Sequence, residues 1–297
     1  MGTSRPAPVY LTLIAGVGAI STAAILIRLC QAPSLAIAAY RLAIAAAVLV
    51  AYGLARRQGV PPARTLGWCA AAGACLAVHF ATWIASLSYT TVASSVVLVT
   101  TNPLFVGLLS WWVLGERPDR RTFAGIGLGL VGATVIGWGD FGGGRDPLLG
   151  DALALAGALA MSAYLLVGRR ARRGVGARAY ATWVYSAAAL FLLTAAGVAG
   201  TPMGPYPRST YGYLVLLALV PQLLGHTAIN WALAHLTAPT VALVILGEPV
   251  GASVLAYAVF GEVPPAATVA GGGLILLGIA LALVRRGPAP TGRSRSP

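Results

Sequence analysis

The stretch VTTNPLF at 99–105, followed by LGERP at 114–118, returns later in the chain as ILGEPVG at 245–251 and FGEVP at 260–264. An offset of 146 residues aligns 89–138 with 235–284 without a gap, and fourteen of the fifty positions are identical. Chance similarity between two apolar segments would not keep Gly-Glu-x-Pro in register. The repeat therefore predicts two homologous halves, which we place at 1–145 and 146–297.

The composition around this repeat is that of an integral membrane protein. Of 297 residues, 58% are hydrophobic and only 9% are charged, whereas soluble domains are about 25% charged. A membrane-spanning helix needs about 20 apolar residues, and only helices or closed barrels satisfy their backbone in lipid. We predict an all-α fold with ten transmembrane helices near 9–28, 34–55, 66–87, 91–114, 122–138, 149–168, 180–199, 210–230, 237–260 and 265–284.

The arginines predict the orientation of these helices. The formal net charge is +13 and every basic residue is an arginine. Cytoplasmic loops of membrane proteins are enriched in Lys and Arg, and sixteen arginines fall on one side: 5, 56, 57, 64, 117, 120, 121, 169, 170, 172, 173, 178, 285, 286, 293 and 295. The other side has only three, at 28, 145 and 208. Both termini are therefore predicted to be cytoplasmic. Because the arginines follow the orientation of the helices in the membrane, we predict no nucleic-acid partner.

The two halves are predicted to lie inverted in the membrane. Each half has five helices, and five is an odd number, so the second half enters from the opposite side. The loop after Glu116 contains three arginines while its counterpart after Glu262 contains none, which agrees with inversion. Inverted repeats are typical of alternating-access transporters, whose substrate site lies near the bilayer midplane between the halves.

Motifs across both halves resemble the EamA-type permeases of the drug/metabolite transporter superfamily. They are SSVVL at 94–98, TNPLF at 101–105 and LGER at 114–117, with echoes at 246–249 and 260–262 and with Tyr40-Arg41-Leu42 in the second span. The resemblance implies ten helices in two inverted halves and export of metabolites. Within the superfamily the chain looks most like the YddG-type amino-acid exporters. Small multidrug-resistance relatives carry a glutamate in the first helix of each unit, whereas this chain has no acid before Glu116.

The fourth and ninth spans carry paired interruptions. Pro103 and Pro249 occupy equivalent repeat positions, and proline cannot donate to the carbonyl four residues earlier. We expect two kinks near the midplane that free the carbonyls of Val99 and Ile245, although such prolines also serve packing alone. Glu248 is the one acid deep inside a span, so it should face a cavity, form a pair or be protonated.

Polar residues align along two further spans. His79, Thr82, Trp83 and Ser86 share one face of the third span, and Gln222, His226 and Asn230 recur every four residues on the eighth. Aligned polar residues in membrane helices usually face the bundle or a water-filled path, although either histidine can instead form a structural interhelical hydrogen bond. Arg41 lies near enough to a helix end that its side chain either reaches the outer interface or points inward.

These observations predict a carrier of small molecules. The substrate-binding candidates are His79, Trp83, Asn102, Tyr164, His226, Asn230 and Glu248, and the helix kinks are at Pro103 and Pro249. The acceptors at Val99, Ile245 and Glu248 would bind an ammonium group, while His79, Asn102, His226 or Asn230 would donate to a carboxylate. Trp83 and Tyr164 would form the walls.

We therefore expect export of neutral and aromatic amino acids across a bacterial inner membrane. The alternatives are export of drug-like cations or nucleotide sugars, or an integral membrane enzyme, although no catalytic motif is present. Cys30, Cys69 and Cys75 show no metal-ligand spacing, so we predict no metal and no cofactor. The fifth and tenth spans should dock the halves within a monomer, and a dimer is possible, through the small residues Gly125, Gly127, Gly129, Gly132, Gly271, Gly272, Gly273 and Gly278.

Overall fold

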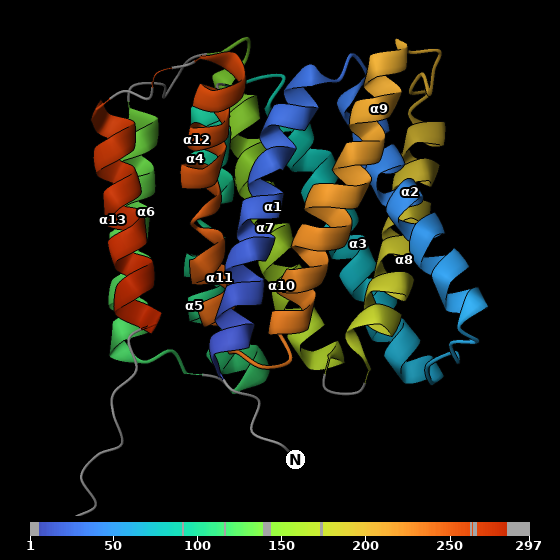
Figure 1. Ribbon diagram of the computed structural model, residues 1–297, viewed down its shortest axis with the longest axis horizontal. Helices are drawn as coiled ribbons and strands as arrows, with labels where there is room; N and C mark the ends of the chain where they lie inside the picture. The colour runs from blue at the N-terminus through green and yellow to red at the C-terminus, as the bar shows by residue number, and fades with distance from the viewer. Residues whose placement is uncertain are drawn as a thin grey trace, which may run out of the picture.

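The computed structural model describes residues 6–90, 92–115, 117–138, 144–172, 175–261, 263 and 266–283, so Glu116, Glu262 and Pro264 of the repeat lie outside the described residues. The regular structure of the described residues is helical throughout (Figure 1). The elements are α1 (Pro6–Leu29), α2 (Ser34–Ala55), α3 (Ala63–Ser86), α4 (Val92–Val99), α5 (Asn102–Leu114), α6 (Arg120–Gly137), α7 (Pro147–Ala171), α8 (Ala177–Val198), α9 (Arg208–Leu217), the π-helix η2 (Ala218–His226), α10 (Thr227–Ala232), α11 (Ala238–Ile245), α12 (Glu248–Phe260) and α13 (Ala266–Leu283).

These elements form the ten predicted spans, which confirms the fold class. Seven described helices or helix chains are long and apolar enough to cross a membrane, and shorter apolar helices complete the set. The fourth span consists of α4 and α5 and the ninth of α11 and α12, each interrupted near its middle. The eighth span runs through α9, η2 and α10, with Pro221 inside the π-helical stretch. The span predicted at 210–230 included no such π-helical stretch.

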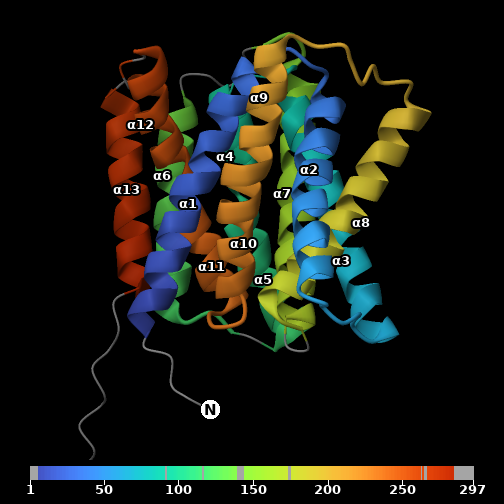
Figure 2. The same cartoon turned by 45° about the vertical axis from the view of Figure 1, so that its right-hand side comes forward.

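The spans of one half pack against those of the other (Figures 1 and 2). The first span of each half lies against the third span of its partner half: α1 contacts α9, η2 and α10, and α7 contacts α3. The second spans, α2 and α8, contact each other, as do the fifth spans, α6 and α13. This reciprocal arrangement brings the two interrupted spans toward the centre, where α1 packs on α12 and α7 on α4 and α5.

The glycine of the repeated Gly-Glu-x-Pro motif ends a half-helix. Gly115 terminates α5 with a φ of 70° and Gly261 terminates α12 with a φ of 69°. Side chains other than glycine are disfavoured in this left-handed conformation. The following α6 begins at Asp119, whose carboxylate accepts from the backbone N–H of Thr122 at 2.7 Å. That hydrogen bond lowers the pKa of the Asp119 carboxyl group.

A reciprocal glycine contact joins α6 to α13. A Cβ atom added at Gly132 would lie 2.4 Å from the carbonyl oxygen of Gly271, and one added at Gly278 would lie 2.6 Å from that of Gly125. The two helices form a pair at one edge of the bundle (Figure 1). Small residues allow such close approach of backbones in lipid. The predicted docking of the two halves is confirmed for these four glycines, whereas a Cβ atom added at Gly127 or Gly273 would meet nothing within 4 Å.

We expect Gly132→Ala to lower the free energy of unfolding by about 1–3 kcal/mol, because the new methyl group overpacks against a backbone oxygen. The matched control is Gly127→Ala on the same helix, where an added Cβ meets nothing within 4 Å and the change removes glycine's conformational penalty of about 1 kcal/mol. Thermal unfolding of both variants in one detergent measures the difference. A Gly132→Ala protein that melts at or above the temperature of Gly127→Ala contradicts the prediction.

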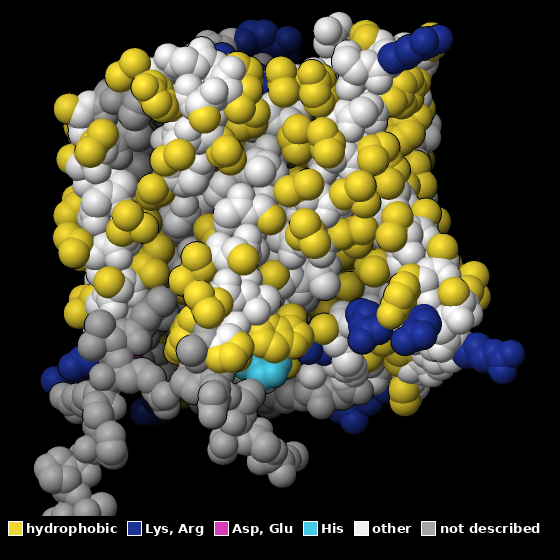
Figure 3. All heavy atoms as spheres, in the orientation of Figure 1, with side chains coloured by type: hydrophobic (Ala, Val, Ile, Leu, Met, Phe, Trp, Pro, Cys, Tyr) yellow, Lys and Arg dark blue, Asp and Glu magenta, His cyan; other side chains and the backbone are white. Residues whose placement is uncertain are grey.

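The outer surface is apolar around the middle of the bundle and basic at its ends (Figure 3). Large apolar side chains such as Leu54, Trp112 and Val198 are at least 75% exposed, which suits contact with lipid. The start of α1 and the end of α13 lie at the same end of the bundle (Figure 1). More of the visible arginines gather at that end than at the other.

Candidate functional site

A cavity of about 30 Å³ lies between the two halves. At roughly 15 Å³ each, it has space for about two water molecules. Its polar lining residues are Arg41, His79, Trp83, Thr100, Asn102, His226 and Glu248, and its apolar lining residues are Ile20, Ala23, Phe80, Val99, Met161 and Ile245. Both halves contribute to this lining.

The two interrupted spans bring backbone termini to the cavity. Helix α4 ends at Val99 and α5 begins at Asn102, while α11 ends at Ile245 and α12 begins at Glu248. Each break lies just before the proline predicted to cause it, because Pro103 and Pro249 have no N–H for the carbonyls of Val99 and Ile245. Non-helical backbone at this depth is tolerated where it lines a cavity. All four helix-end residues line this one.

Arg41 points inward from α2, which settles the choice between interface and interior. Its side chain is 0% exposed, its Nε donates to Oε1 of Gln222 at 2.8 Å, and its guanidinium lies 4.1 Å from the centre of the Phe80 ring. A buried charge in a membrane is expensive and typically marks a functional position.

Aromatic rings from α3 form one wall of the cavity. The rings of His79 and Trp83 stack with 5.9 Å between centroids and 10° between planes, and His226 meets Phe80 edge-on at 5.3 Å. Nδ1 of His79 lies 3.0 Å from the carbonyl oxygen of Gly157. Because a carbonyl only accepts, Nδ1 carries the proton, and the Nε2 of the neutral ring is an acceptor. In that neutral form His79 offers the cavity an acceptor at Nε2, whereas its predicted role was that of a donor.

Unpartnered donors gather at this cavity. Among the described residues, seven buried side-chain nitrogen or oxygen atoms have no hydrogen-bond partner. Five of them belong to cavity residues or to the partner of Arg41, and they are Arg41 Nη1, Trp83 Nε1, Asn102 Nδ2, His226 Nδ1 and Gln222 Nε2. Buried polar groups in proteins are normally hydrogen-bonded, so a cluster of exceptions calls for a functional explanation. Four of these atoms are N–H donors, and His226 Nδ1 donates or accepts according to its tautomer, so the cluster suits a ligand that brings acceptors.

Glu248 is the acid among the lining residues of the cavity. It occupies the first position of α12, directly before Pro249. The hydroxyl of Ser21 on α1 donates to its backbone carbonyl at 3.3 Å, which ties this helix start to the first span. The Glu248 carboxylate therefore belongs to a helix end that is tied to α1.

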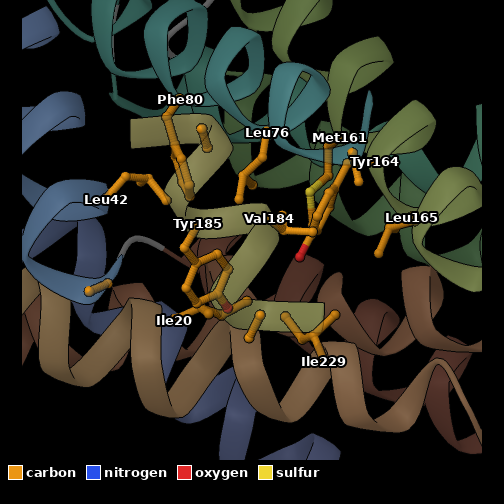
Figure 4. Packing of buried hydrophobic residues seen from close by; sticks show 14 of the residues in the cluster. Ile20, Leu42, Leu76, Phe80, Met161, Tyr164, Leu165, Val184, Tyr185 and Ile229 are labelled. Carbon is orange, nitrogen blue, oxygen red and sulfur yellow. The ribbon is translucent and has the colours of Figure 1, made fainter. Parts of the chain in front are cut away.

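Tyr164 and Asn230 lie in a separate hydrogen-bond network and are not among the lining residues. The hydroxyl of Tyr164 donates to Oδ1 of Asn230 at 2.5 Å, and Nδ2 of Asn230 donates to the hydroxyl of Tyr185 at 3.2 Å. Nε of Arg172 donates to the Asn230 carbonyl oxygen at 2.9 Å. Tyr164 and Tyr185 also pack in the hydrophobic core (Figure 4). The geometry fits a structural role that joins α7, α8 and α10.

The structure thus brings together five of the seven predicted binding residues, namely His79, Trp83, Asn102, His226 and Glu248. Arg41, Phe80, Thr100 and Met161 are additional lining residues that the sequence analysis had not assigned to the site. Arg41 could have been assigned to the site from the sequence, because an arginine inside an apolar span is unusual. No feature of the sequence separates Phe80 and Met161 from the other apolar residues, which occur on every face of these helices.

Comparison with known proteins places the chain in a family. The model of the EamA-like transporter family matches residues 7–138 and 148–284, one match in each half. A probable terminal-alkyne amino-acid exporter of Streptantibioticus cattleyicolor is 32% identical over 191 residues, which are 62% of this chain and 61% of that protein. The uncharacterized transporter YetK of Bacillus subtilis is 28% identical over 132 residues, 43% of this chain and 38% of that protein. The chain therefore matches less than two thirds of the length of either relative.

A solved crystal structure shares the fold. It superposes with a TM-score of 0.77 at 22% sequence identity and covers 93% of this chain and 97% of that one. Because the family model matches nearly the whole of both halves, the chain belongs to the EamA-like transporter family of the drug/metabolite transporter superfamily, a family of multi-pass membrane transporters and not of enzymes.

Proposed function

We propose that the protein is a carrier that exports neutral and aromatic amino acids across a bacterial inner membrane by alternating access. The observation that supports this most directly is the cavity between the halves, which combines one carboxylate, one guanidinium, unpartnered donors and an aromatic wall. A zwitterion with a variable side chain needs these features together. The Streptantibioticus relative, named as a probable amino-acid exporter, supports the same substrate class.

The charges of the cavity favour a zwitterion over the alternative substrates. A nucleotide sugar carries two phosphates and requires several cations, whereas Arg41 is the one basic residue among the described lining residues apart from the two histidines. A lipophilic cation would favour an acid in the first span of each half. Those spans, α1 and α7, contribute Ile20, Ala23 and Met161 to the lining, none of which is charged.

Transport requires this cavity to widen and to open toward each side in turn, since about 30 Å³ cannot hold an amino acid. The reciprocal packing of first and third spans across the halves provides two related interfaces, α1 on η2 and α10, and α7 on α3. Loosening one interface while the other stays packed would expose the cavity on one side. This is the rocking motion typical of inverted-repeat transporters.

The direction of export and the cytoplasmic placement of both termini are part of the proposal. The positive-inside rule supports that placement, because arginines concentrate at the end of the bundle where α1 begins. Export follows from the family resemblance and the named relative.

Transport into proteoliposomes tests the proposal. The purified full-length protein is expected to accumulate radiolabelled phenylalanine, methionine and threonine by exchange against the same unlabelled amino acid inside, and protein-free liposomes measure leakage. Broad selectivity is expected because aromatic walls tolerate different side chains. Uptake of a nucleotide sugar or a quaternary ammonium compound, with no uptake of the three amino acids, contradicts the proposed function.

A further inference from the structure

Arg41 is held in a way that leaves one edge of its guanidinium available. Nε donates to Oε1 of Gln222 on the π-helix η2, which belongs to the other half of the protein. The ring of Phe80 lies against one face of the guanidinium, 4.1 Å from its central carbon. The edge formed by the two terminal nitrogens points away from the Nε contact, and a carboxylate binds such an edge through two parallel hydrogen bonds.

Arg41 and Gln222 each have one buried donor without a hydrogen-bond partner. Nη1 of Arg41 and Nε2 of Gln222 make no hydrogen bond, and both side chains are 0% exposed. Within the part of the chain that the structure describes, Arg41 forms no ion pair, even though Glu248 lines the same cavity. Glu248 interacts electrostatically with Arg41 without a direct contact, and a fully buried guanidinium that lacks a direct anionic partner is unfavourable. A ligand that brings its own anion would supply the missing partner.

The geometry of Gln222 suits it to holding Arg41 in place. Its amide oxygen accepts from Arg41, so its amide nitrogen has both hydrogens unused. The side chain is carried by a π-helical segment that contains Pro221, and π-helical insertions occur frequently at functional sites. Gln222 is neutral, so it holds the guanidinium in place and leaves the positive charge of Arg41 intact. A glutamate at this position would neutralise that charge.

We propose that Arg41 binds the carboxylate of the transported substrate and that Gln222 is the positioning residue that aims it. The inference rests on the proposed function and narrows its substrate class to amino acids with a free carboxylate. Amides, esters and decarboxylated amines of the same side chain lack the anion and should be poor substrates. The carboxylate would be held between α2 of the first half and η2 of the second.

The test compares ligands and variants in the same proteoliposomes. In the wild type, excess L-phenylalanine should inhibit labelled phenylalanine uptake, while L-phenylalaninamide and phenethylamine should inhibit at least about 30-fold less well, the factor expected when a buried charge pair loses one member. Arg41→Gln should raise the KM for phenylalanine by about 30-fold or more and remove the preference over the amide. Arg208→Gln makes the same charge change at an exposed position and should leave both measurements unaltered.

Two variants examine the positioning role of Gln222. Gln222→Leu should raise the KM about fivefold or more with kcat within twofold, because a lost hydrogen bond misplaces an anchor that is still charged. Gln222→Glu places a carboxylate next to Nε and should raise the KM further by neutralising Arg41. A purely structural glutamine would instead lower the amount of folded protein and leave the KM of the remainder unchanged, which would overturn this assignment.

The outcomes separate the inference from the function on which it rests. Two results overturn the inference and leave amino-acid transport standing. The first is inhibition of labelled phenylalanine uptake by L-phenylalaninamide as strong as that by L-phenylalanine. The second is a KM for phenylalanine in Arg41→Gln that lies within twofold of the wild-type value. If no amino acid is transported by the wild type, the proposed function and the inference both fail. The comparison of phenylalanine with its amide uses the wild-type protein alone. It therefore tests recognition of the substrate carboxylate even if Arg41→Gln does not fold.

Discussion

Replacing Glu248 with glutamine is expected to reduce kcat/KM for phenylalanine by about 30-fold or more, because the substrate ammonium loses its charged partner inside the cavity. Removing one member of a desolvated, hydrogen-bonded charge pair costs about 2–5 kcal/mol, and 1.4 kcal/mol corresponds to tenfold. Glutamine has nearly the same shape as glutamate, and the contact from Ser21 reaches the backbone of residue 248. The fold should therefore be retained.

The matched control for this charge change is Asp151→Asn. Asp151 lies near the start of α7, accepts a hydrogen bond from Thr90 at 2.8 Å and is not a lining residue of the cavity. Both variants remove one acidic charge, so a general effect of charge would appear in both. Initial rates over a range of phenylalanine concentrations, with thermal unfolding of each protein, provide the measurement. A Glu248→Gln protein within threefold of the wild-type kcat/KM shows that the carboxylate does not bind the ammonium.

Replacing Trp83 with alanine is expected to raise the KM for phenylalanine about tenfold or more. The substitution removes the flat surface beside His79 together with the unpartnered Nε1 donor. An aromatic contact contributes about 0.5–1.5 kcal/mol beyond its buried area, and a hydrogen bond about as much again. The side chain is 4% exposed, so the free energy of unfolding should also fall by about 3–5 kcal/mol.

Two further variants divide this effect into its parts. Trp83→Phe keeps an aromatic wall and loses the N–H donor, so its KM should lie between those of wild type and Trp83→Ala. Trp112→Ala removes an equally large ring from a position that is 82% exposed, and its KM should match wild type. Equal KM values for Trp83→Ala and Trp112→Ala would mean that the indole of Trp83 does not contact substrate.

The ten spans were predictable because the physics that selects them acts locally. Lipid requires about 20 consecutive apolar residues with internally satisfied backbone groups, and that requirement is visible in any window of the sequence. The second span, predicted at 34–55, coincides with α2 (Ser34–Ala55). The breaks at Asn102 and Glu248 were also foreseen, since the missing N–H of proline acts four residues away on the same helix.

The π-helical stretch was not predictable in the same way. Pro221 marks a place where the helix cannot form its regular bonds, but the sequence does not say whether the helix kinks, breaks or widens. Packing against α1 and α2 accompanies the widened form in the structure. That geometry places Gln222 opposite Arg41, 181 residues away in the chain.

By itself the sequence determined the number of spans, the repeat, the two glycine-rich spans that pack together as α6 and α13, and five of the residues that share a cavity. Only the tertiary structure decided that Arg41 points inward to Gln222 and Phe80, and that Tyr164 and Asn230 bond to each other away from the cavity. The physical reason is the sequence distance over which each effect acts. Hydrophobic length and proline chemistry operate within a single helix, whereas the direction in which a side chain faces depends on how each helix is rotated against neighbours far away in the sequence.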